Sequence, residues 1–593
     1  MKRIVVGIID TGLDTKCKYF LRTNYEACSV KQDGNVSLLK SDYEDKNGNI
    51  KRQTYGNGQS IEYVYDQYDR LIAEKASNDG KALKQTVTYT YNSEGKIARI
   101  QDLKNNDVIT YDYDISGRMT GYLNKEGRIT YGYDNFDRTE KVTVDFDDKK
   151  FTTNYSYLSA NRPGATMLPE GKSDRVYDSL QRESVHQVYP NKNANKHLRS
   201  EVTFLELGNN RTTEWVEGYD NFVGTSGEDK QHVNGYTSFE YAYDKNGNIT
   251  KVIEKDGVKK REKTYEYDNL NQLVRENDEA QKKTIIYAYD NAGNLLRKIE
   301  YSYTTGKPEK VLKTIEYNYE DPIWKDKMTA YEGQAVTYDG MGNPLSYRDK
   351  MQFSWQDGTQ LAEVQLKDGT SISYKYNTDG VRIGKTVGSI ETSYLVDSSG
   401  EMQAMKQGKE SLVFMYDAMG RREGFIWYTQ DEKQGVYYYL YNMQGDVIGI
   451  VASDMTPVVT YEYNSWGKLL NTNGKEADTV GKLNPFRYRG YIYEEESGLY
   501  YIASRYYDPE TCRFINADDI ELLTTTPTSL TDKNLYAYCD NNPVVRVDAD
   551  GEIWTVVAGV GINLVTSYVA AKVTGQEYGW KDAAAAVGTG VIS

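Results

Sequence analysis

The sequence predicts a mainly β protein, in which a long antiparallel sheet of hairpins spirals into a hollow shell and a short apolar, helical tail follows. Three observations predict this fold. Tyrosine is unusually abundant, with 55 Tyr in 593 residues against 12 Phe and 7 Trp. A short unit marked by two tyrosines recurs along the chain, and turn-forming residues follow each copy. Tyrosine favours pleated, half-buried strands, so this composition is typical of a large all-β protein.

The recurring unit is Tyr-x-Tyr, then Asp or Asn, then polar residues that often end in Gly, then an apolar residue. Copies are YVYDQYDRL, YTYNSEGKI, YDYDISGRM, YGYDNFDRT, YAYDKNGNI, YEYDNLNQL, YAYDNAGNL, YKYNTDGVR, YLYNMQGDV and YEYNSWGKL. Tyrosines at i and i+2 face the same side of a strand, while the Asp or Asn and the Gly reverse the chain. Each copy therefore predicts a strand, a turn and a strand, with tyrosines that pack the sheet.

Successive hairpins are expected to pair edge to edge, because one hairpin alone is only marginally stable in water. A sheet of more than about ten strands must coil or close, so we expect one continuous wall that curves around a space. The repeat is interrupted between residues 180 and 240 and again between 300 and 370, where we expect loops or longer strands within the same wall. A β-propeller or a straight solenoid is the alternative.

The charge balance argues against several functions. The chain carries 72 Lys and Arg against 87 Asp and Glu, a net charge of -15, so the shell is not expected to bind nucleic acid. Four cysteines are too few for a disulfide scaffold. No signal peptide is visible, because Asp10 interrupts the first apolar run. No phosphate-binding loop, dinucleotide motif or zinc spacing appears, so we expect no cofactor and no metal.

The pattern changes at Asn484, where NPFRYRGYIYEEESGLYYIASRYYDPETCRFINADD begins, followed by NLYAYCDNNPVVRVDADG. This segment resembles the RHS repeat-associated core domain, which ends the shell in RHS and YD-repeat proteins, including polymorphic toxins and the C component of Tc toxins. Four regions follow: an N-terminal segment of uncertain structure (1–50), a YD-repeat shell (51–483), the core domain (484–551) and an apolar tail (552–593).

The resemblance implies an intramolecular aspartic-type protease that cuts the tail from the shell. Aligning RFINADD and RVDADG with the family motifs gives Asp518 and Asp548 as the catalytic acids. Two carboxyls suit amide hydrolysis, since one takes a proton while the other donates. Arg513 is expected to orient the site. The alternatives are aspartates that cap turns and an Arg513 salt bridge within the shell.

The same resemblance places the cleavage junction at Gly551, Glu552 and Ile553, with the cut after Glu552. This sequence departs from the family pattern, because Asp519 and Ala549 stand where proline is usual. Those departures leave it open whether cleavage is efficient.

The tail contains an uncharged, apolar run over 553–571. Three interpretations stay open: a pre-toxin segment packed inside the shell, an element that inserts into a membrane, and a buried helix. Only 42 residues follow Gly551, too few for an ordinary enzyme domain, so we expect a truncated toxin region and assign no toxin chemistry.

The function expected from these observations is an encapsulating shell of a bacterial RHS-type polymorphic toxin, secreted or at the cell surface. Its partners would be its own C-terminal segment as cargo, an immunity protein and a secretion apparatus. The alternative is a cell-surface adhesin without cargo that binds carbohydrate or neighbouring cells. A protease acting on other proteins is a weaker third hypothesis, because a site sealed in a wall cannot admit large substrates.

Overall fold

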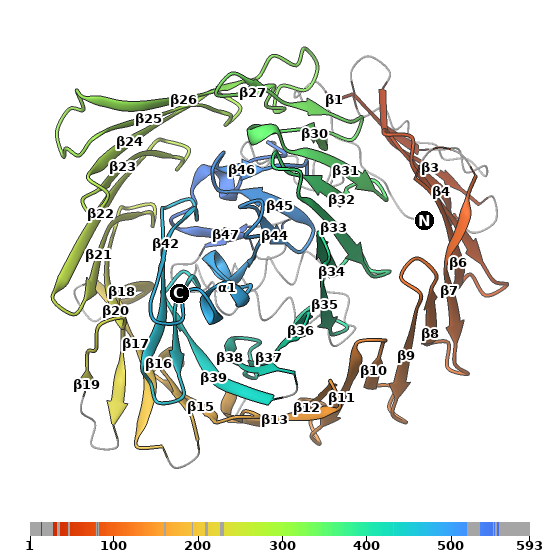
Figure 1. Ribbon diagram of the computed structural model, residues 1–593, viewed down its shortest axis with the longest axis horizontal. Helices are drawn as coiled ribbons and strands as arrows, with labels where there is room; N and C mark the ends of the chain where they lie inside the picture. Colours follow the sequence, from red (N-terminus) through yellow and green to blue (C-terminus); the bar gives the residue numbers. More distant parts are fainter. Residues whose placement is uncertain are drawn as a thin grey trace.

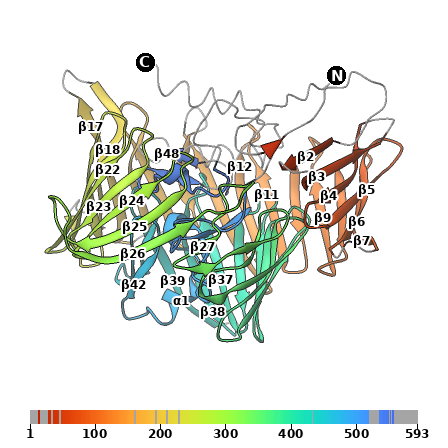
Figure 2. The same ribbon diagram turned by 90° about the horizontal axis from the view of Figure 1, so that it is seen from above.

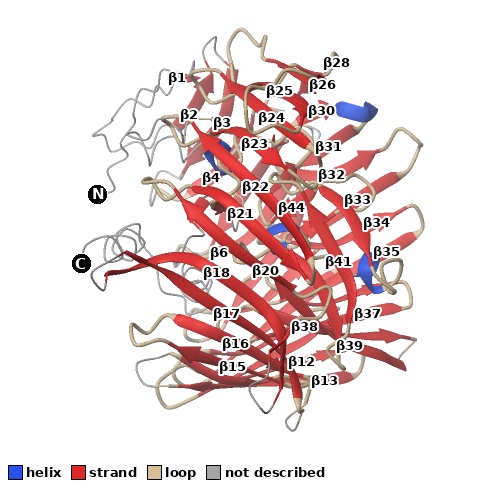
Figure 3. Cartoon of the chain, turned by 90° about the vertical axis from the view of Figure 1, so that its left-hand side faces the viewer, coloured by secondary structure: helices blue, strands red, loops and turns tan. Residues whose placement is uncertain are grey.

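The computed structural model describes residues 13–14, 28–32, 36–44, 48–78, 80, 82–158, 162–191, 194–207, 211–225, 230–430, 432–518, 534–548, 551 and 554–556. Strands dominate these residues (Figure 3), so the prediction of a mainly β fold is confirmed. The helical turns among them are η2 (Arg348–Lys350), α1 (Val480–Leu483), η3 (Tyr488–Gly490) and η4 (Cys539–Asn541).

The first sheet contains 28 strands of the described residues. They are β1 (Leu13–Asp14), β2 (Cys28–Gln32), β3 (Val36–Tyr43), β4 (Ile50–Tyr55), β5 (Ser60–Tyr65), β6 (Leu71–Ser77), β7 (Lys84–Tyr91), β8 (Ile97–Asp102), β9 (Asp107–Tyr113), β10 (Met119–Leu123), β11 (Gly127–Tyr133), β12 (Thr139–Phe146), β13 (Lys149–Tyr157), β14 (Pro163–Met167), β15 (Lys172–Tyr177), β16 (Glu183–Tyr189), β17 (Lys196–Leu207), β18 (Arg211–Thr225), β19 (Lys230–Gln231), β20 (Thr237–Tyr243), β21 (Ile249–Asp256), β22 (Lys259–Tyr267), β23 (Leu273–Asp278), β24 (Lys283–Tyr289), β25 (Leu295–Ser302), β26 (Val311–Asn318), β27 (Ala330–Tyr331) and β28 (Gln334–Ala335).

The second sheet has 14 strands among the described residues, and two small sheets follow it. The second sheet holds β29 (Thr337–Tyr338), β30 (Pro344–Ser346), β31 (Gln352–Gln356), β32 (Gln360–Gln365), β33 (Ser371–Tyr376), β34 (Arg382–Val387), β35 (Ile390–Val396), β36 (Met402–Gln407), β37 (Glu410–Tyr416), β38 (Arg422–Thr429), β39 (Glu432–Tyr441), β40 (Val447–Ala452), β41 (Pro457–Tyr463) and β42 (Leu469–Asn473). The small sheets hold β43 (Ile492–Tyr493), β44 (Tyr500–Ile502), β45 (Arg505–Asp508) and β46 (Arg513–Phe514), and then β47 (Arg546–Asp548) and β48 (Trp554–Val556).

The wall is two large sheets and not the single continuous sheet that the repeats predict. The break lies between β28 and β29, inside the second interruption of the repeat pattern. The first interruption contains two long strands, β17 with 12 residues and β18 with 15, which stay in the first sheet as expected.

The two sheets form successive turns of one spiral. Figure 1 shows the first sheet as an outer ring and the second sheet curving inside it. The described residues of 480–518 and 534–548, from α1 to β47, lie in the middle of this curve and are called the central region below (Figure 1). Figure 2 shows that the second sheet extends beyond the first on one side, so the described chain resembles a bowl.

In the first half of the first sheet, a hairpin turn is tied to the next hairpin by one tyrosine and one basic residue. At the turn between β9 and β10, Asp114 Oδ1 accepts hydrogen bonds from the backbone N–H groups of Ser116 and Arg118, both at 2.9 Å. The Arg118 guanidinium carbon lies 4.7 Å from the ring centre of Tyr133 in the following repeat. The Tyr133 hydroxyl in turn donates to the backbone carbonyl of Met119 at 2.6 Å.

This bond to the preceding repeat recurs along both sheets. The second tyrosine of a repeat donates in the same way at Tyr91, Tyr113, Tyr157, Tyr267, Tyr289, Tyr376, Tyr441 and Tyr463. The second tyrosine therefore joins consecutive hairpins, in addition to filling space between them.

The repeat also carries its own curvature. Val64 pairs with Ala73 but Tyr65 pairs with Leu71, so one residue of the return strand is left out of the ladder. The same shift precedes Tyr91, Tyr133, Tyr243, Tyr267, Tyr289, Tyr376, Tyr416 and Tyr463. A β-bulge bends a strand and increases its twist, so a bulge in each repeat curls the wall.

The layers are held together by apolar packing. One cluster joins Ile129 of the first sheet to Leu395 and Val413 of the second. Another joins Tyr287 of the first sheet, Trp466 of the second and Tyr507 of the central region. The predicted role of tyrosine in packing is therefore confirmed.

The predicted helical tail lies outside the described residues apart from β48, which is a strand paired antiparallel with β47 and not a helix. None of the helices in the part of the chain that the structure describes is long and apolar enough to cross a bilayer.

Candidate functional site

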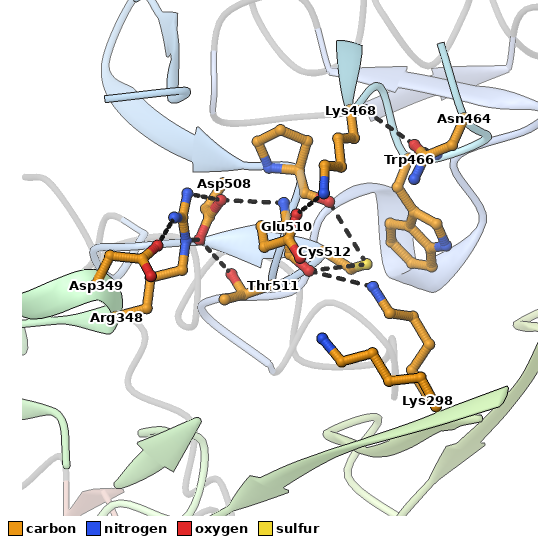
Figure 4. Close-up of polar contacts among 12 residues, drawn as sticks. Lys298, Arg348, Asp349, Asn464, Trp466, Lys468, Asp508, Glu510, Thr511 and Cys512 are labelled. Carbon is orange, nitrogen blue, oxygen red and sulfur yellow. Dashed lines mark hydrogen bonds and ion pairs between the residues drawn. The ribbon is translucent and has the colours of Figure 1, made fainter. Parts of the chain in front are cut away.

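The central region is joined to the second sheet by ion pairs, as Figure 4 shows for the turn after β45. Arg348 of η2 donates from Nε and Nη2 to the carboxylate of Asp508, at 2.7 and 2.9 Å. Burial alone would raise the pKa of Asp508, but the Arg348 guanidinium outweighs burial and holds this pKa below its ordinary value. Lys468, in the turn before β42, lies 2.5 Å from Glu510. These contacts set the position of the strands that follow.

The two aspartates predicted as catalytic acids lie together on one arginine. Arg505 Nη2 is 2.8 Å from Asp518 Oδ2 and 3.4 Å from Asp548 Oδ2. The side chains of Arg505, Asp518 and Asp548 are 5%, 14% and 4% exposed, so the cluster is nearly shielded from water. A cation in contact with both carboxylates offsets their mutual repulsion and allows two acids to be buried side by side.

The same cluster holds the chain at the predicted junction. Asp548 Oδ1 accepts a hydrogen bond from the Gly551 N–H at 2.8 Å, and Arg505 Nε donates to the Gly551 carbonyl. That carbonyl belongs to the peptide bond between Gly551 and Glu552. The guanidinium therefore polarises a peptide bond one residue before the predicted cut.

Gly551 is required at this place for two reasons. Its φ is +80°, a conformation that residues with a side chain rarely adopt. A Cβ atom built on it would lie 2.6 Å from the backbone oxygen of Ile502 and 2.6 Å from Ser504 Oγ. The chain can pass this close to β44 and β45 only without a side chain.

Backbone contacts position the two acids. The Tyr491 hydroxyl donates to the Asp548 carbonyl at 2.5 Å and accepts from the Asp548 N–H at 3.2 Å. The Asp518 N–H donates to the Leu535 carbonyl at 3.0 Å, and Arg505 Nη1 donates to the same oxygen at 3.1 Å. Three segments distant in sequence therefore meet at this cluster.

Arg513 contacts a different part of the molecule from the two acids. Its guanidinium contacts the Tyr319 hydroxyl and donates to the Asp326 carbonyl at 2.6 Å, which fixes β46 to the first sheet. Arg505 is the arginine between the aspartates, and sequence reasoning missed it. Arg505 lies 13 residues before Asp518 with no motif spacing to mark it, and only the folded β44–β46 sheet brings the two together.

The described part of the predicted junction is Gly551, while Glu552 and Ile553 lie outside the described residues. Among the described residues, one group offers clustered atoms of the kind that bind metals: His186, Asp417 and Glu423. It lies between the two large sheets, apart from the aspartates.

Comparison with known proteins identifies a matching family and solved structures with a similar fold. The sequence profile of the Teneurin YD-shell family matches residues 211–544, more than half of the chain. The crystal structure of TcdB2-TccC3-TEV has a TM-score of 0.67 at 16% identity and covers 88% of this chain. The Photorhabdus luminescens Tc holotoxin pore has a TM-score of 0.65 at 15% identity and covers 90%. The chain spans 28% of the length of each of these two chains.

Curated relatives match shorter stretches. The tRNA nuclease WapA of Bacillus subtilis is 33% identical over 267 residues, which are 44% of this chain and 11% of the nuclease. The double-stranded DNA deaminase toxin A of Burkholderia cenocepacia is 22% identical over 492 residues, 75% of this chain and 30% of that toxin. The resemblance to RHS and YD-repeat proteins is thereby confirmed, and the chain belongs to the Teneurin YD-shell family.

Proposed function

We propose that this chain is the C-terminal part of an encapsulating toxin shell, which sequesters a C-terminal segment and releases it by autoproteolysis at the junction Gly551 to Ile553. The proposal depends on the observation that two hydrogen bonds fix the backbone of Gly551. Its N–H is bound by Asp548 and its carbonyl by Arg505, and Asp518 completes the cluster. Turn-capping aspartates alone would not need a shared arginine that also binds the outgoing chain.

The chemistry proposed for the site uses the two acids in different roles. One acid, in its ionised form, takes a proton from the attacking water as the water oxygen bonds to the carbonyl carbon. The other acid, in its protonated form, gives its proton to the leaving amide nitrogen as the C–N bond breaks. Arg505 positions both acids and the peptide backbone. Because the cluster is buried within the central region, it acts on its own chain.

The names of two relatives support the proposal that the shell holds a toxic cargo. WapA is a tRNA nuclease and the Burkholderia protein is a DNA deaminase toxin, and this chain matches only a part of each. We infer that the segment after the junction is the cargo or its beginning, and that an immunity protein and a secretion apparatus act with a longer toxin. Secretion to the bacterial surface or beyond belongs to the same proposal.

Intact-mass spectrometry of the purified chain tests the cleavage. The wild type should yield a fragment ending at Glu552 and a second fragment starting at Ile553, which stay together in size-exclusion chromatography. Asp518→Asn and Asp548→Asn should each abolish cleavage. The matched control is Asp540→Asn, which alters a buried aspartate paired with Arg546 at 2.6 Å outside the cluster, and should still be cut.

An uncut wild-type chain, or cutting that survives both aspartate substitutions, would contradict the autoproteolysis. If the fragments separate without denaturant, the sequestering role is wrong. Binding of a glycan to an uncut chain would favour the adhesin instead.

A further inference from the structure

A buried cluster of ionic side chains joins the two large sheets at a place the cleavage site does not use. Arg175 lies on β15, and Glu183 and His186 lie on β16 of the first sheet. Asp417 follows β37, and Glu423 lies on β38 of the second sheet. His186 is 3% exposed, and Asp417 and Glu423 are each 2% exposed.

The contacts within this cluster cross between the sheets. His186 Nε2 lies 2.9 Å from Glu423 Oε2, and His186 Nδ1 lies 3.7 Å from Glu183 Oε1. Arg175 donates from Nε to Glu183 at 2.7 Å and pairs through Nη2 with Asp417. In other repeats the Asp that begins the turn forms an ion pair with the residue four positions later, as Asp114 does with Arg118. Here Asp417 pairs instead with an arginine of the other sheet.

The charges in the cluster do not balance. Three carboxylates, of Glu183, Asp417 and Glu423, face two guanidiniums, of Arg175 and Arg421, the latter 3.5 Å from Glu183. Asp174, which also faces His186, is paired with Lys172. The phenols of Tyr219, Tyr438 and Tyr441 also face Glu423 or Arg421. One negative charge in excess remains buried, which is costly unless something neutralises it.

We propose that His186 and Glu423 together bind a single proton in the folded protein, carried on Glu423 and hydrogen-bonded to a neutral His186. This buried proton site is independent of the proposed cleavage function. One proton makes the cluster neutral, and the 2.9 Å contact is the hydrogen bond in which it lies. Burial raises the pKa of Glu423 to about 7 and holds the pKa of His186 well below its ordinary value, which fits this assignment.

A metal ion is the competing occupant. The ligand atoms of His186, Asp417 and Glu423 lie within 4.8 Å of one another. However, the Arg175 guanidinium already contacts Asp417, so a divalent cation would meet a positive charge at one of its three ligands. The charge count requires one positive charge, which a proton supplies.

The site has a consequence for pH. In the unfolded chain between pH 5 and 6.5, His186 carries a proton, because the ordinary pKa is 6.5 for His and 4.5 for Glu. In the folded chain Glu423 carries it. The number of bound protons is the same in both states, so this pair does not make stability change across that interval. The junction between the sheets is therefore insensitive to mild acid.

Glu423→Gln breaks this compensation. The amide mimics a protonated Glu423 but cannot take the proton that His186 gives up, so folding must now remove a proton from His186. Stability should then fall as pH falls below 6.5, by a factor of about 30 in the unfolding equilibrium constant at pH 5 relative to pH 8. The wild type should lose far less over the same range. The control is His186→Gln combined with Glu423→Gln, which should restore the wild-type profile.

Urea unfolding of the full chain at pH 5, 6, 7 and 8 gives these profiles. A second measurement does not need a variant: the chain has three histidines, so selective ¹⁵N labelling yields three imidazoles to follow by NMR. The His186 imidazole should stay neutral from pH 8 to pH 5, with the exposed His232 as the reference. A His186 imidazole that is charged at pH 6, or equal pH profiles for wild type and Glu423→Gln, would overturn the proposal. So would a stoichiometric metal in the purified protein whose removal shifts the His186 signals.

Discussion

The turns on one side of the first sheet differ between its two halves. In the first half the fifth residue of the turn is Arg70, Arg118, Arg138 or Arg182, which pairs with the Asp that begins the turn. In the second half it is Asn248, Gln272 or Asn294, which donates to the equivalent Asp. In the turns with amides the fifth residue is buried against residues 534–542, whereas in the turns with arginines it stays partly exposed. The turn tips are exposed in both halves, as at Ile115, Phe136 and Leu270.

The difference is one of hydrogen-bonding capacity. An arginine side chain has only donors, whereas an amide can donate to its own turn and accept from a partner. Asn294 accepts from Asn534 at 2.8 Å, Gln272 from Asn541 at 2.9 Å and Asn248 from Asn542 at 2.9 Å. The choice of one residue per repeat therefore determines where the segment between the two catalytic-acid candidates can bind.

The largest expected effect comes from placing the wrong turn residue in the covered half. Asn294→Arg introduces a cation where the side chain is fully buried and removes the acceptor for Asn534. We expect the free energy of unfolding to fall by about 3 to 5 kcal/mol, because the larger side chain overpacks a fully buried site and leaves Asn534 without its acceptor. Urea unfolding measures the loss, and self-cleavage should fall with it. A loss below 1 kcal/mol would show that the amide is not needed for docking.

A smaller effect is expected when the donor on the other side of this interface is removed. Asn541→Ala leaves Gln272 Oε1 and the Gly293 carbonyl without the N–H groups that they accept at 2.9 and 2.8 Å. The cost should be about 2 kcal/mol, the typical penalty for buried groups left unsatisfied. Asn135→Ala, at an exposed turn of the uncovered half, is the matched control and should be neutral.

The reverse exchange in the uncovered half should matter less. Arg118→Asn keeps a donor for Asp114 but loses the stacking on Tyr133, and the side chain is 31% exposed. We expect a smaller loss of unfolding free energy than for Asn541→Ala, measured by urea unfolding of the two variants side by side. A loss as large as that of Asn294→Arg would mean that the halves do not differ.

The smallest effect is expected at an exposed tip. Phe136 is 76% exposed, so Phe136→Ser should change the unfolding free energy by no more than about 0.5 kcal/mol. Thermal unfolding of the variant beside the wild type checks this. A larger loss would reveal packing at this tip.

Much of the fold followed from local sequence rules. The Tyr-x-Tyr-Asp units predicted hairpins because strand alternation and turn chemistry are local, and Asp518 and Asp548 could be placed by resemblance alone. Arg505 and the split into two sheets could not be predicted, since both depend on contacts between distant segments. The bulge before the second tyrosine depends on pairing register, which no single strand reveals.

The change from arginine to amide is a different case. It is visible in the sequence, as YDYDISGRM against YAYDKNGNI and YAYDNAGNL. The structural role of this change depends on where Asn534, Asn541 and Asn542 lie in the folded chain. The sequence alone therefore does not predict it.

Hydrogen–deuterium exchange on the unmodified chain tests the central claim most directly, that residues 534–542 are docked on the amide turns and that Gly551 is held at the acid cluster. The account predicts slow exchange of the Asn248, Asn294 and Gly551 amides, and faster exchange of the Arg118 and Arg138 amides at the uncovered turns. Equal exchange in the two halves, together with rapid exchange at Gly551, would contradict it.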